Sequence, residues 1–171
     1  MIIWINGAFG SGKSSVAEEI GRRIDKSYVY DPELVGYFLW EVFPDELKRK
    51  GNFQHIPIWR GINYKILRHL SENYDGVVIA PMTVYIRQYY NEIVGKLIDD
   101  GISVKCFILS APKQVILDRL VCRGDSENGW AARHIDGCIG AFETDIPGEK
   151  IDTVGKSIED IALEIIEKSN I

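Results

Sequence analysis

The first fifteen residues constrain the fold of this chain more than any other stretch. Ile2-Ile3-Trp4-Ile5 is a short apolar run typical of a buried strand. After Asn6 it is followed at once by Gly7-Ala8-Phe9-Gly10-Ser11-Gly12-Lys13-Ser14, which is a glycine, four residues and then Gly-Lys-Ser. This spacing between a strand and a helix is that of a phosphate-binding loop. From Lys13 to Ile24 apolar residues recur every four positions, which predicts the helix that the pattern requires.

Each residue type in this loop has a chemical reason. Glycines let backbone N–H groups turn toward phosphate oxygens at φ values that a Cβ would obstruct. Lys13 is placed to reach the β- and γ-phosphates and Ser14 to ligate Mg²⁺, while the start of the helix presents its positive end to the anion. An ordinary glycine-rich turn is the alternative, and the full match disfavours it. We expect a nucleoside triphosphate with Mg²⁺ to contact Gly7, Ala8, Phe9, Gly10, Ser11, Gly12, Lys13, Ser14 and Ser15.

Length and charge limit what else the protein does. The chain has 171 residues, which fits one domain spanning residues 1–171. Its net charge of −5 argues against nucleic acid as the main partner, because phosphate backbones require a basic surface. No apolar stretch approaches the length of a membrane span, so we expect a cytoplasmic protein. The sequence leaves open whether it is a monomer or a homodimer.

A carboxylate follows the second expected strand. Tyr28-Val29-Tyr30 is apolar and short, and Asp31-Pro32 ends it and opens a new helix. Asp31 thus stands at the carboxyl end of a strand, the edge where open α/β sheets bind ligands. It is a candidate to accept a proton from a substrate hydroxyl or to hold a metal-bound water. Capping the following helix is an equally good and compatible role, and Glu33 is a weaker candidate of the same kind.

The segment 34–72 is interpreted as a substrate-binding insertion. Half of all aromatic residues lie between Tyr28 and Tyr64, a density that suits a pocket for a planar ring as well as a core. Arg60 and Asn63 lie one helical turn apart beside Trp59, and these three are candidate substrate-binding residues. An exposed helix face is the alternative for Arg60. The buried face of this helix is predicted to carry Ile62, Ile66 and Leu70.

The segment 119–134 is interpreted as a lid. Arg119 and Arg123 lie four residues apart on one helix, a polar glycine-containing stretch follows, and Arg133 stands in the next predicted helix. Such arginines would neutralise charge on a transferred phosphoryl group, and a solvated helix end with an ordinary loop is the alternative.

The end of the third expected strand bears on how a metal would be held. The strand at residues 77–80 ends in Pro81-Met82-Thr83, without the acidic residue that often supports Mg²⁺. Ser14, with help from Asp31, would then be the support of the metal.

Five strands alternating with helices predict a parallel sheet with helices on both faces. This layout resembles the P-loop nucleoside monophosphate kinases and shikimate kinases, a resemblance that implies the strand order 2-3-1-4-5. In that group the arginines of an R-L-x-x-R segment, here Arg119-Leu120-Val121-Cys122-Arg123, contact the nucleotide. The acid after strand two, here Asp31, contacts the phosphoryl acceptor.

More specific segments resemble the family of bacterial ATP-binding tunicamycin-resistance proteins. They are residues 1–13, Tyr28-Val29-Tyr30-Asp31-Pro32-Glu33, Phe53-Gln54, Pro57, Trp59-Arg60, Asn63-Tyr64, Pro81-Met82-Thr83 and Trp130-Ala131-Ala132. The resemblance implies binding of ATP and recognition of tunicamycin, an antibiotic that contains uridine and N-acetylglucosamine. It places such a ligand at the aromatic segment with Arg60 and Asn63.

Two functions therefore compete. One is a small-molecule kinase that moves the γ-phosphoryl group of ATP to a nucleoside- or sugar-like hydroxyl, with Lys13, Asp31, Arg119 and Arg123 as its catalytic residues and Ser14 on the metal. The other is an ATP-dependent protein that sequesters an antibiotic without phosphoryl transfer. A regulatory GTPase is disfavoured, since the chain has no Asn-Lys-x-Asp segment and no D-x-x-G segment directly at the end of strand three.

Overall fold

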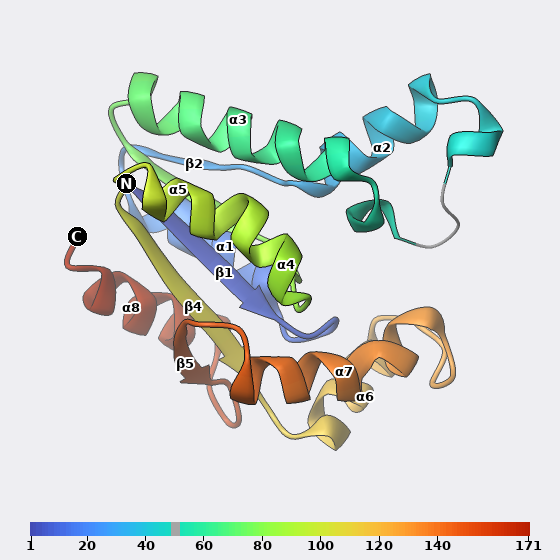
Figure 1. Cartoon of the computed structure of the whole chain (residues 1–171). Coiled ribbons are helices and arrows are strands. Elements are labelled where there is room, and N and C mark those ends of the chain that lie inside the picture. Colours follow the sequence, from blue (N-terminus) through green and yellow to red (C-terminus); the bar gives the residue numbers. More distant parts are fainter. Residues whose placement is uncertain (49–51) are drawn as a thin grey trace.

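The protein is built on one five-stranded parallel sheet. A computed structural model describes residues 1–48 and 52–171. The strands are β1 (Ile2–Gly7), β2 (Ser27–Val29), β3 (Val77–Pro81), β4 (Val104–Ser110) and β5 (Glu149–Asp152). They are ordered β2-β3-β1-β4-β5, and each neighbouring pair is parallel (Figure 1). The expected fold class and strand order are confirmed.

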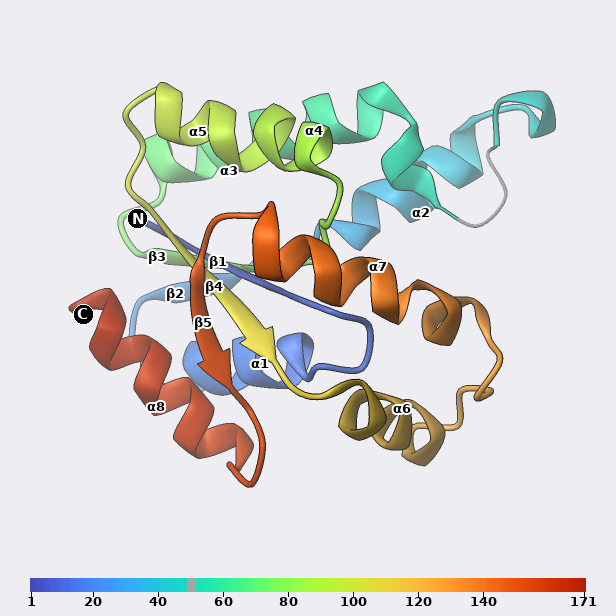
Figure 2. The same ribbon diagram turned by 60° about the horizontal axis from the view of Figure 1, so that its bottom comes forward.

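Helices cover both faces of the sheet. They are α1 (Lys13–Arg23), α2 (Glu33–Val42), α3 (Pro57–Asn73), α4 (Arg87–Tyr90), α5 (Lys96–Asp99), α6 (Lys113–Cys122), α7 (Trp130–Thr144) and α8 (Ile158–Ser169). A π-helical turn at Asn91–Gly95 joins α4 to α5, and 3-10 turns occupy Asp45–Leu47 and Phe53–His55. Figure 2 shows α1 and α8 on one side of the sheet and α3, α5 and α7 on the other.

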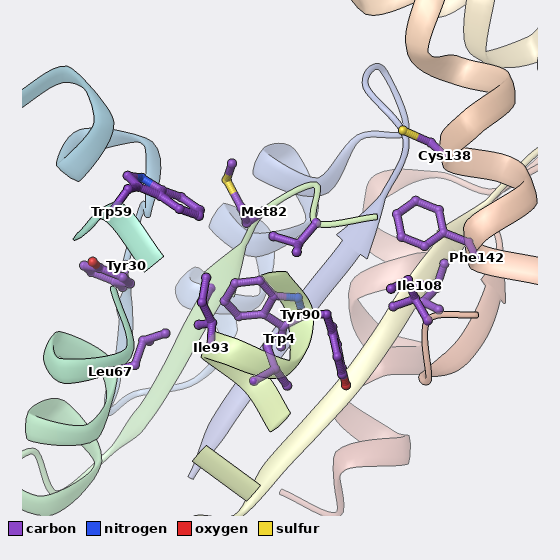
Figure 3. Packing of buried hydrophobic residues seen from close by; sticks show 14 of the residues in the cluster. Trp4, Tyr30, Trp59, Leu67, Met82, Tyr90, Ile93, Ile108, Cys138 and Phe142 are labelled. Atoms are coloured by element: carbon purple, nitrogen blue, oxygen red, sulfur yellow. The ribbon is translucent and has the colours of Figure 1, made fainter. Parts of the chain in front are cut away.

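Strand alternation explains this two-sided arrangement. Along β1, Ile3 and Ile5 face a core built with α1 and α8, whereas Ile2 and Trp4 face the larger core under α2 to α7. All four side chains are fully buried. Figure 3 shows the larger core, in which Trp4 lies among Met82, Tyr90 and Ile93. Because β1 is central and buried on both sides, the loop that follows it starts from a rigid support.

Capping contacts define the boundaries of several helices. Ser157 accepts a hydrogen bond from the backbone N–H of Asp160, and the Asp160 carboxylate accepts one from the Ser157 N–H, which together form a capping box at the start of α8. Gly101, with φ of 80°, ends the helical segment that closes with α5.

The predicted face of α3 packs against the larger core, but it is not the most deeply buried face of the helix. Ile62, Ile66 and Leu70 are only half-buried, and the buried stripe consists of Trp59, Arg60, Asn63, Tyr64 and Leu67. The helix is covered on a second side by Gln54 and by the segment that carries Glu92, and the spacing of apolar residues in the sequence does not reveal such neighbours.

The insertion 34–72 corresponds to α2, the 3-10 turns and α3, and its residues 49–51 lie outside the described residues. In the described part of the chain, no helix has the length and apolar character needed to cross a membrane.

Candidate active site

The phosphate-binding loop is anchored by side chains at the ends of β1 and β3. The Asn6 amide oxygen accepts hydrogen bonds from the backbone N–H groups of Gly7 (3.0 Å) and Val84 (2.9 Å), and its Nδ2 donates to the Val84 carbonyl (2.8 Å). Thr83 Oγ1 donates to the Gly7 carbonyl at 2.8 Å. Thr83 follows β3, where many P-loop proteins carry an acidic residue that supports Mg²⁺. In this chain the residue is a threonine, and its hydroxyl binds the phosphate-binding loop.

The loop backbone can accommodate a phosphate chain. Gly10 and Gly12 have φ values of 83° and 95°, which side chains rarely adopt, and a Cβ at Gly10 would lie 2.8 Å from Leu120 Cγ. Helix α1 starts at Lys13 with no side-chain cap on its N–H groups. The Ser11 hydroxyl is buried and has no hydrogen-bond partner among the described residues. These are donors left free at the positive end of a helix, as an anion site requires.

Lys13 is partly withdrawn from water. Its Nζ donates to the Ala8 carbonyl at 2.9 Å and lies 6.0 Å from the centre of the Phe9 ring. Burial lowers the pKa of the ammonium to about 8, and the neighbouring Cys138 and Glu33 oppose this shift. An ammonium in such a place gains from an incoming phosphate, because the anion would replace missing solvation.

The two expected lid arginines reach the same place as the loop. A cavity of about 140 Å³ is lined by Gly10, Gly12, Lys13, Ser14, Ser15, Arg119 and Arg123. Arg119 is held from outside this cavity by Thr153, which accepts hydrogen bonds from both of its terminal nitrogens at 2.9 Å. Arg123 pairs with Asp125 at 2.6 Å and is exposed. Three cations thus surround one small space, which is the electrostatics of a phosphate site.

Arg133 lies elsewhere. It is exposed on α7 and does not line this cavity. The lid segment 119–134 comprises the end of α6, the intervening loop and the first turn of α7.

Asp31 and Glu33 share the start of α2. The Asp31 Oδ1 accepts a hydrogen bond from the Glu33 N–H at 2.9 Å, so the predicted capping contact is present. The carboxylate whose charge acts on Lys13 is that of Glu33. Tyr37 donates its hydroxyl to Glu33 at 3.2 Å, and the Glu33 charge raises the pKa of that phenol. Sequence analysis made Glu33 a weaker candidate than Asp31 for contact with a phosphoryl acceptor. These contacts make Glu33 an equal candidate for that role.

Trp59, Arg60 and Asn63 have structural partners. Trp59 donates its indole N–H to the Pro32 carbonyl (3.1 Å), and Asn63 joins Tyr30 Oη (2.6 Å) to the Trp59 carbonyl (2.9 Å). Arg60 is 4% exposed, donates to the Glu92 carboxylate at 2.5 Å and to the Gln54 carbonyl, and stacks 4.2 Å from the Tyr89 ring centre. Their polar groups bind the insertion to the body of the protein in this structure.

Two features of the site were not among the site residues predicted from the sequence. Thr153, which orients Arg119, is fully buried just after β5. Trp130, the first residue of α7, packs edge-on against Phe9 of the phosphate-binding loop with ring centres 4.8 Å apart, and His134 stacks behind it at 4.3 Å. Thr153 belongs to no segment that the sequence singled out, whereas Trp130 lies in a segment that resembles the tunicamycin-resistance proteins.

The described residues around the phosphate-binding loop offer few side-chain ligands to a metal ion. Among the described residues no group of three or more His, Cys, Asp and Glu side chains converges. Ser14 is exposed beside Lys13 and lines the cationic cavity. These residues fit Mg²⁺ bound mainly through the phosphates of a nucleotide, with the Ser14 hydroxyl as a protein ligand.

The comparisons agree with this geometry. No protein-family model matches the sequence, and a sequence search of curated proteins finds no match. In structure the chain is similar to the tunicamycin resistance protein of Deinococcus radiodurans, with a TM-score of 0.85 and 28% identity over 99% of this chain and 95% of that one. It is also similar to a gluconokinase of Sinorhizobium meliloti (TM-score 0.67, 16% identity, 98% and 90% covered) and to the shikimate kinase of Aquifex aeolicus (0.61, 19%, 99% and 96%).

The chain has the P-loop kinase fold. The resemblance to tunicamycin-resistance proteins is confirmed as a structural match over nearly the whole of both chains. At 16–19% identity the two kinases show the fold alone. Within the P-loop kinase fold, the cavity with Lys13, Arg119 and Arg123 lies at the carboxyl edge of the sheet, where ligands of open α/β proteins bind.

Proposed function

We propose that the protein is an ATP-dependent phosphotransferase that moves the γ-phosphoryl group to a hydroxyl of a small nucleoside- or sugar-like molecule. The observation that carries this proposal is the convergence of Lys13, Ser14, Arg119 and Arg123 on one cavity at the phosphate-binding loop. A protein that only holds a nucleotide needs the loop and its lysine. Two further arginines fit charge that changes on phosphoryl transfer.

The roles follow from position. Bound Mg·ATP would supply the phosphoryl group and the metal that neutralises it. The loop N–H groups and Lys13 bind the phosphates, and Ser14 is the protein ligand available to Mg²⁺. Arg119, oriented by Thr153, and Arg123, on the exposed lid, stabilise the charge on the transferred group. Asp31 or Glu33 orients the acceptor hydroxyl and accepts its proton.

The acceptor class is inferred from the neighbours. By their names, the gluconokinase and the shikimate kinase phosphorylate gluconate and shikimate, which are small hydroxylated acids. The similar protein with 28% identity is a tunicamycin resistance protein. We therefore place tunicamycin, or a metabolite that shares its nucleoside and sugar parts, first among acceptors. The insertion 34–72 is the proposed substrate-binding part, together with Asp31 and Glu33, which lie just before it, after the end of β2 and at the first residue of α2. Because the reaction consumes ATP, we place the protein in the cytoplasm, where ATP is available. The protein acts there as a monomer or a homodimer.

Sequestration without chemistry is the second candidate. It is favoured by the end of β3, where Thr83 binds the loop and no acid is offered to Mg²⁺. It is also favoured by the capping contact of Asp31 with Glu33. In this alternative ATP closes the lid and the antibiotic is held unmodified.

Mass spectrometry of tunicamycin after incubation with the protein and Mg·ATP separates the two. A gain of one phosphate, absent with Lys13→Ala protein, supports transfer. Unmodified drug that co-elutes with the protein only when ATP is present supports sequestration. If neither occurs, tunicamycin is not the ligand, and release of ADP in the presence of a set of sugars, sugar acids and nucleosides tests the kinase proposal separately. No ADP release with any of them would refute it.

A further inference from the structure

A second, larger cavity lies behind the phosphate-binding loop. It measures about 590 Å³, within the range of small-molecule sites, whereas the loop cavity measures about 140 Å³. It is enclosed by the ends of β4 and β5, the start of α6 and one face of α7, elements that lie next to one another in Figure 2. The two cavities share no lining residue. Ala8, whose carbonyl receives Lys13, forms part of the wall of the larger one.

The wall of this cavity has an apolar part and a polar part. Ile108, Ile116 and Phe142 are almost fully buried, and Ile139 is half-buried beside them. Figure 3 shows Phe142 of α7 facing Ile108 of β4. These side chains form the apolar part of the wall, against which an apolar ring or branched chain of a ligand can pack.

Charges of both signs stand at the rim. Lys113 and Asp136 neutralise each other at 2.7 Å, and Asp152 accepts a hydrogen bond from the Val154 N–H. Lys150 and Glu143 also line the cavity, and within residues 1–48 and 52–171 neither takes part in an ion pair. In the sheet register Lys150 is paired with Ile108, and Ile151 faces the opposite core, so Lys150 stands on the α7 side.

We propose that this cavity binds a zwitterionic small molecule with an apolar side chain, of the class of aromatic or branched amino acids. The apolar walls take the side chain. Lys150 takes the carboxylate, assisted by the start of α6, whose N–H groups have no side-chain cap. Glu143 takes the ammonium group. Within the described residues, Lys150 and the carboxylates of Glu143 and Asp152 take part in no ion pair, and their position beside an apolar surface is the complement of such a molecule.

Isothermal titration calorimetry on the whole chain tests this site with three related probes. L-Phenylalanine carries both charges, phenylacetate lacks the ammonium group, and phenethylamine lacks the carboxylate. We expect one site for L-phenylalanine and binding roughly tenfold weaker for either of the others, because each leaves one rim charge without its partner. L-Leucine and L-tryptophan serve to size the apolar part.

Variants locate the binding. Lys150→Met and Glu143→Gln should each weaken binding of L-phenylalanine roughly tenfold. Lys26→Met and Glu18→Gln are matched exposed controls outside the cavity and should bind as the wild type. Ile139→Trp should abolish binding by filling the space. If that variant fails to fold, the two rim variants decide, since both change exposed side chains. The proposal is overturned if none of the three amino acids binds, or if both rim variants bind L-phenylalanine like the wild type.

Discussion

Arg119 and Thr153 form a two-point contact across 34 residues of sequence. Nη1 of Arg119 donates to the Thr153 hydroxyl and Nη2 to the Thr153 carbonyl, both at 2.9 Å. Thr153 is fully buried, and its N–H and hydroxyl both donate to the Ser110 carbonyl at the end of β4. The orientation of a lid arginine is thereby set by the sheet itself.

Thr153→Val keeps the shape of this residue and removes one of the two contacts. We expect it to weaken Mg·ATP binding roughly three- to tenfold, because a guanidinium held by one hydrogen bond is less well oriented toward the phosphates. Arg119→Met, which removes the guanidinium itself, should cause a larger loss. Nucleotide titration measures both. Thr144→Val, an exposed threonine whose hydroxyl donates within α7, is the control. Wild-type affinity in both Thr153→Val and Arg119→Met would remove Arg119 from the nucleotide site.

Lys13 predicts a pH dependence of nucleotide binding. Phosphates bind the charged ammonium, and burial holds its pKa at about 8 in the free protein. The dissociation constant for Mg·ATP should therefore rise as the pH passes 8, approaching roughly tenfold per pH unit well above it. Lys13→Ala should bind nucleotide hardly at all. An affinity that is flat from pH 7 to 10 in the wild type would contradict the role of Lys13.

The same shift affects stability with the opposite sense. The folded pKa of about 8 lies below the ordinary value of 10.5, so between these two values the unfolded chain binds more protons than the folded one. The free energy of unfolding should then rise with pH through this window. Urea unfolding of the wild type and of Lys13→Met at pH 7.5 and 10 isolates this contribution. It is absent if the difference between the two proteins does not change.

Asp31 and Glu33 can be separated by isosteric changes. Asp31→Asn and Glu33→Gln should both leave Mg·ATP affinity close to wild type, because the loop makes those contacts. The variant that removes the proton acceptor should lower turnover on the best acceptor by about 10²- to 10⁴-fold, the usual size of general base catalysis. Full turnover in Asp31→Asn leaves that residue with its capping contact alone. Full turnover in both excludes a carboxylate base at the start of α2.

Trp130 should report on the phosphate-binding loop. Trp4 and Trp59 are fully buried, whereas Trp130 is 36% exposed and touches Phe9. We expect Mg·ATP to change the intrinsic fluorescence of the wild type and this change to disappear in Trp130→Phe. Trp40→Phe, a change outside the loop, should keep it. Retention of the signal by Trp130→Phe would show that the contact between Phe9 and Trp130 does not respond to nucleotide.

Arg60 is expected to act on stability. Arg60→Met leaves the Glu92 carboxylate and the Gln54 carbonyl without a buried donor and should lower the free energy of unfolding by about 3 kcal/mol. Arg68→Met, on an exposed part of the same helix, should change it by less than about 1 kcal/mol. Chemical unfolding measures both. If Arg60→Met is as stable as the wild type and instead loses acceptor binding, the substrate role inferred from the sequence holds.

The fold was predictable because its signals are local. Strands of apolar residues, helices with four-residue spacing and the capping box at Ser157 each act within a few residues, and parallel α/β alternation leaves few topologies. The phosphate-binding loop was predictable for the same reason, since its backbone conformation depends on three closely spaced glycines, Gly7, Gly10 and Gly12. The role of Arg60 and Asn63 was harder to predict, because a polar pair one turn apart has the same pattern whether it faces solvent or the Glu92 and Tyr30 side chains.

By itself, the sequence determined a parallel α/β sheet, a loop able to bind phosphates and the arginines four residues apart on α6. These depend on short-range sterics, helix periodicity and backbone conformation. Only the tertiary structure decided which side chains from distant segments meet. It placed Glu33 in the field of Lys13, Thr153 under Arg119 and Trp130 against Phe9, and it opened the cavity between β4, β5 and α7. Such contacts depend on how whole elements pack, and no single segment carries that information.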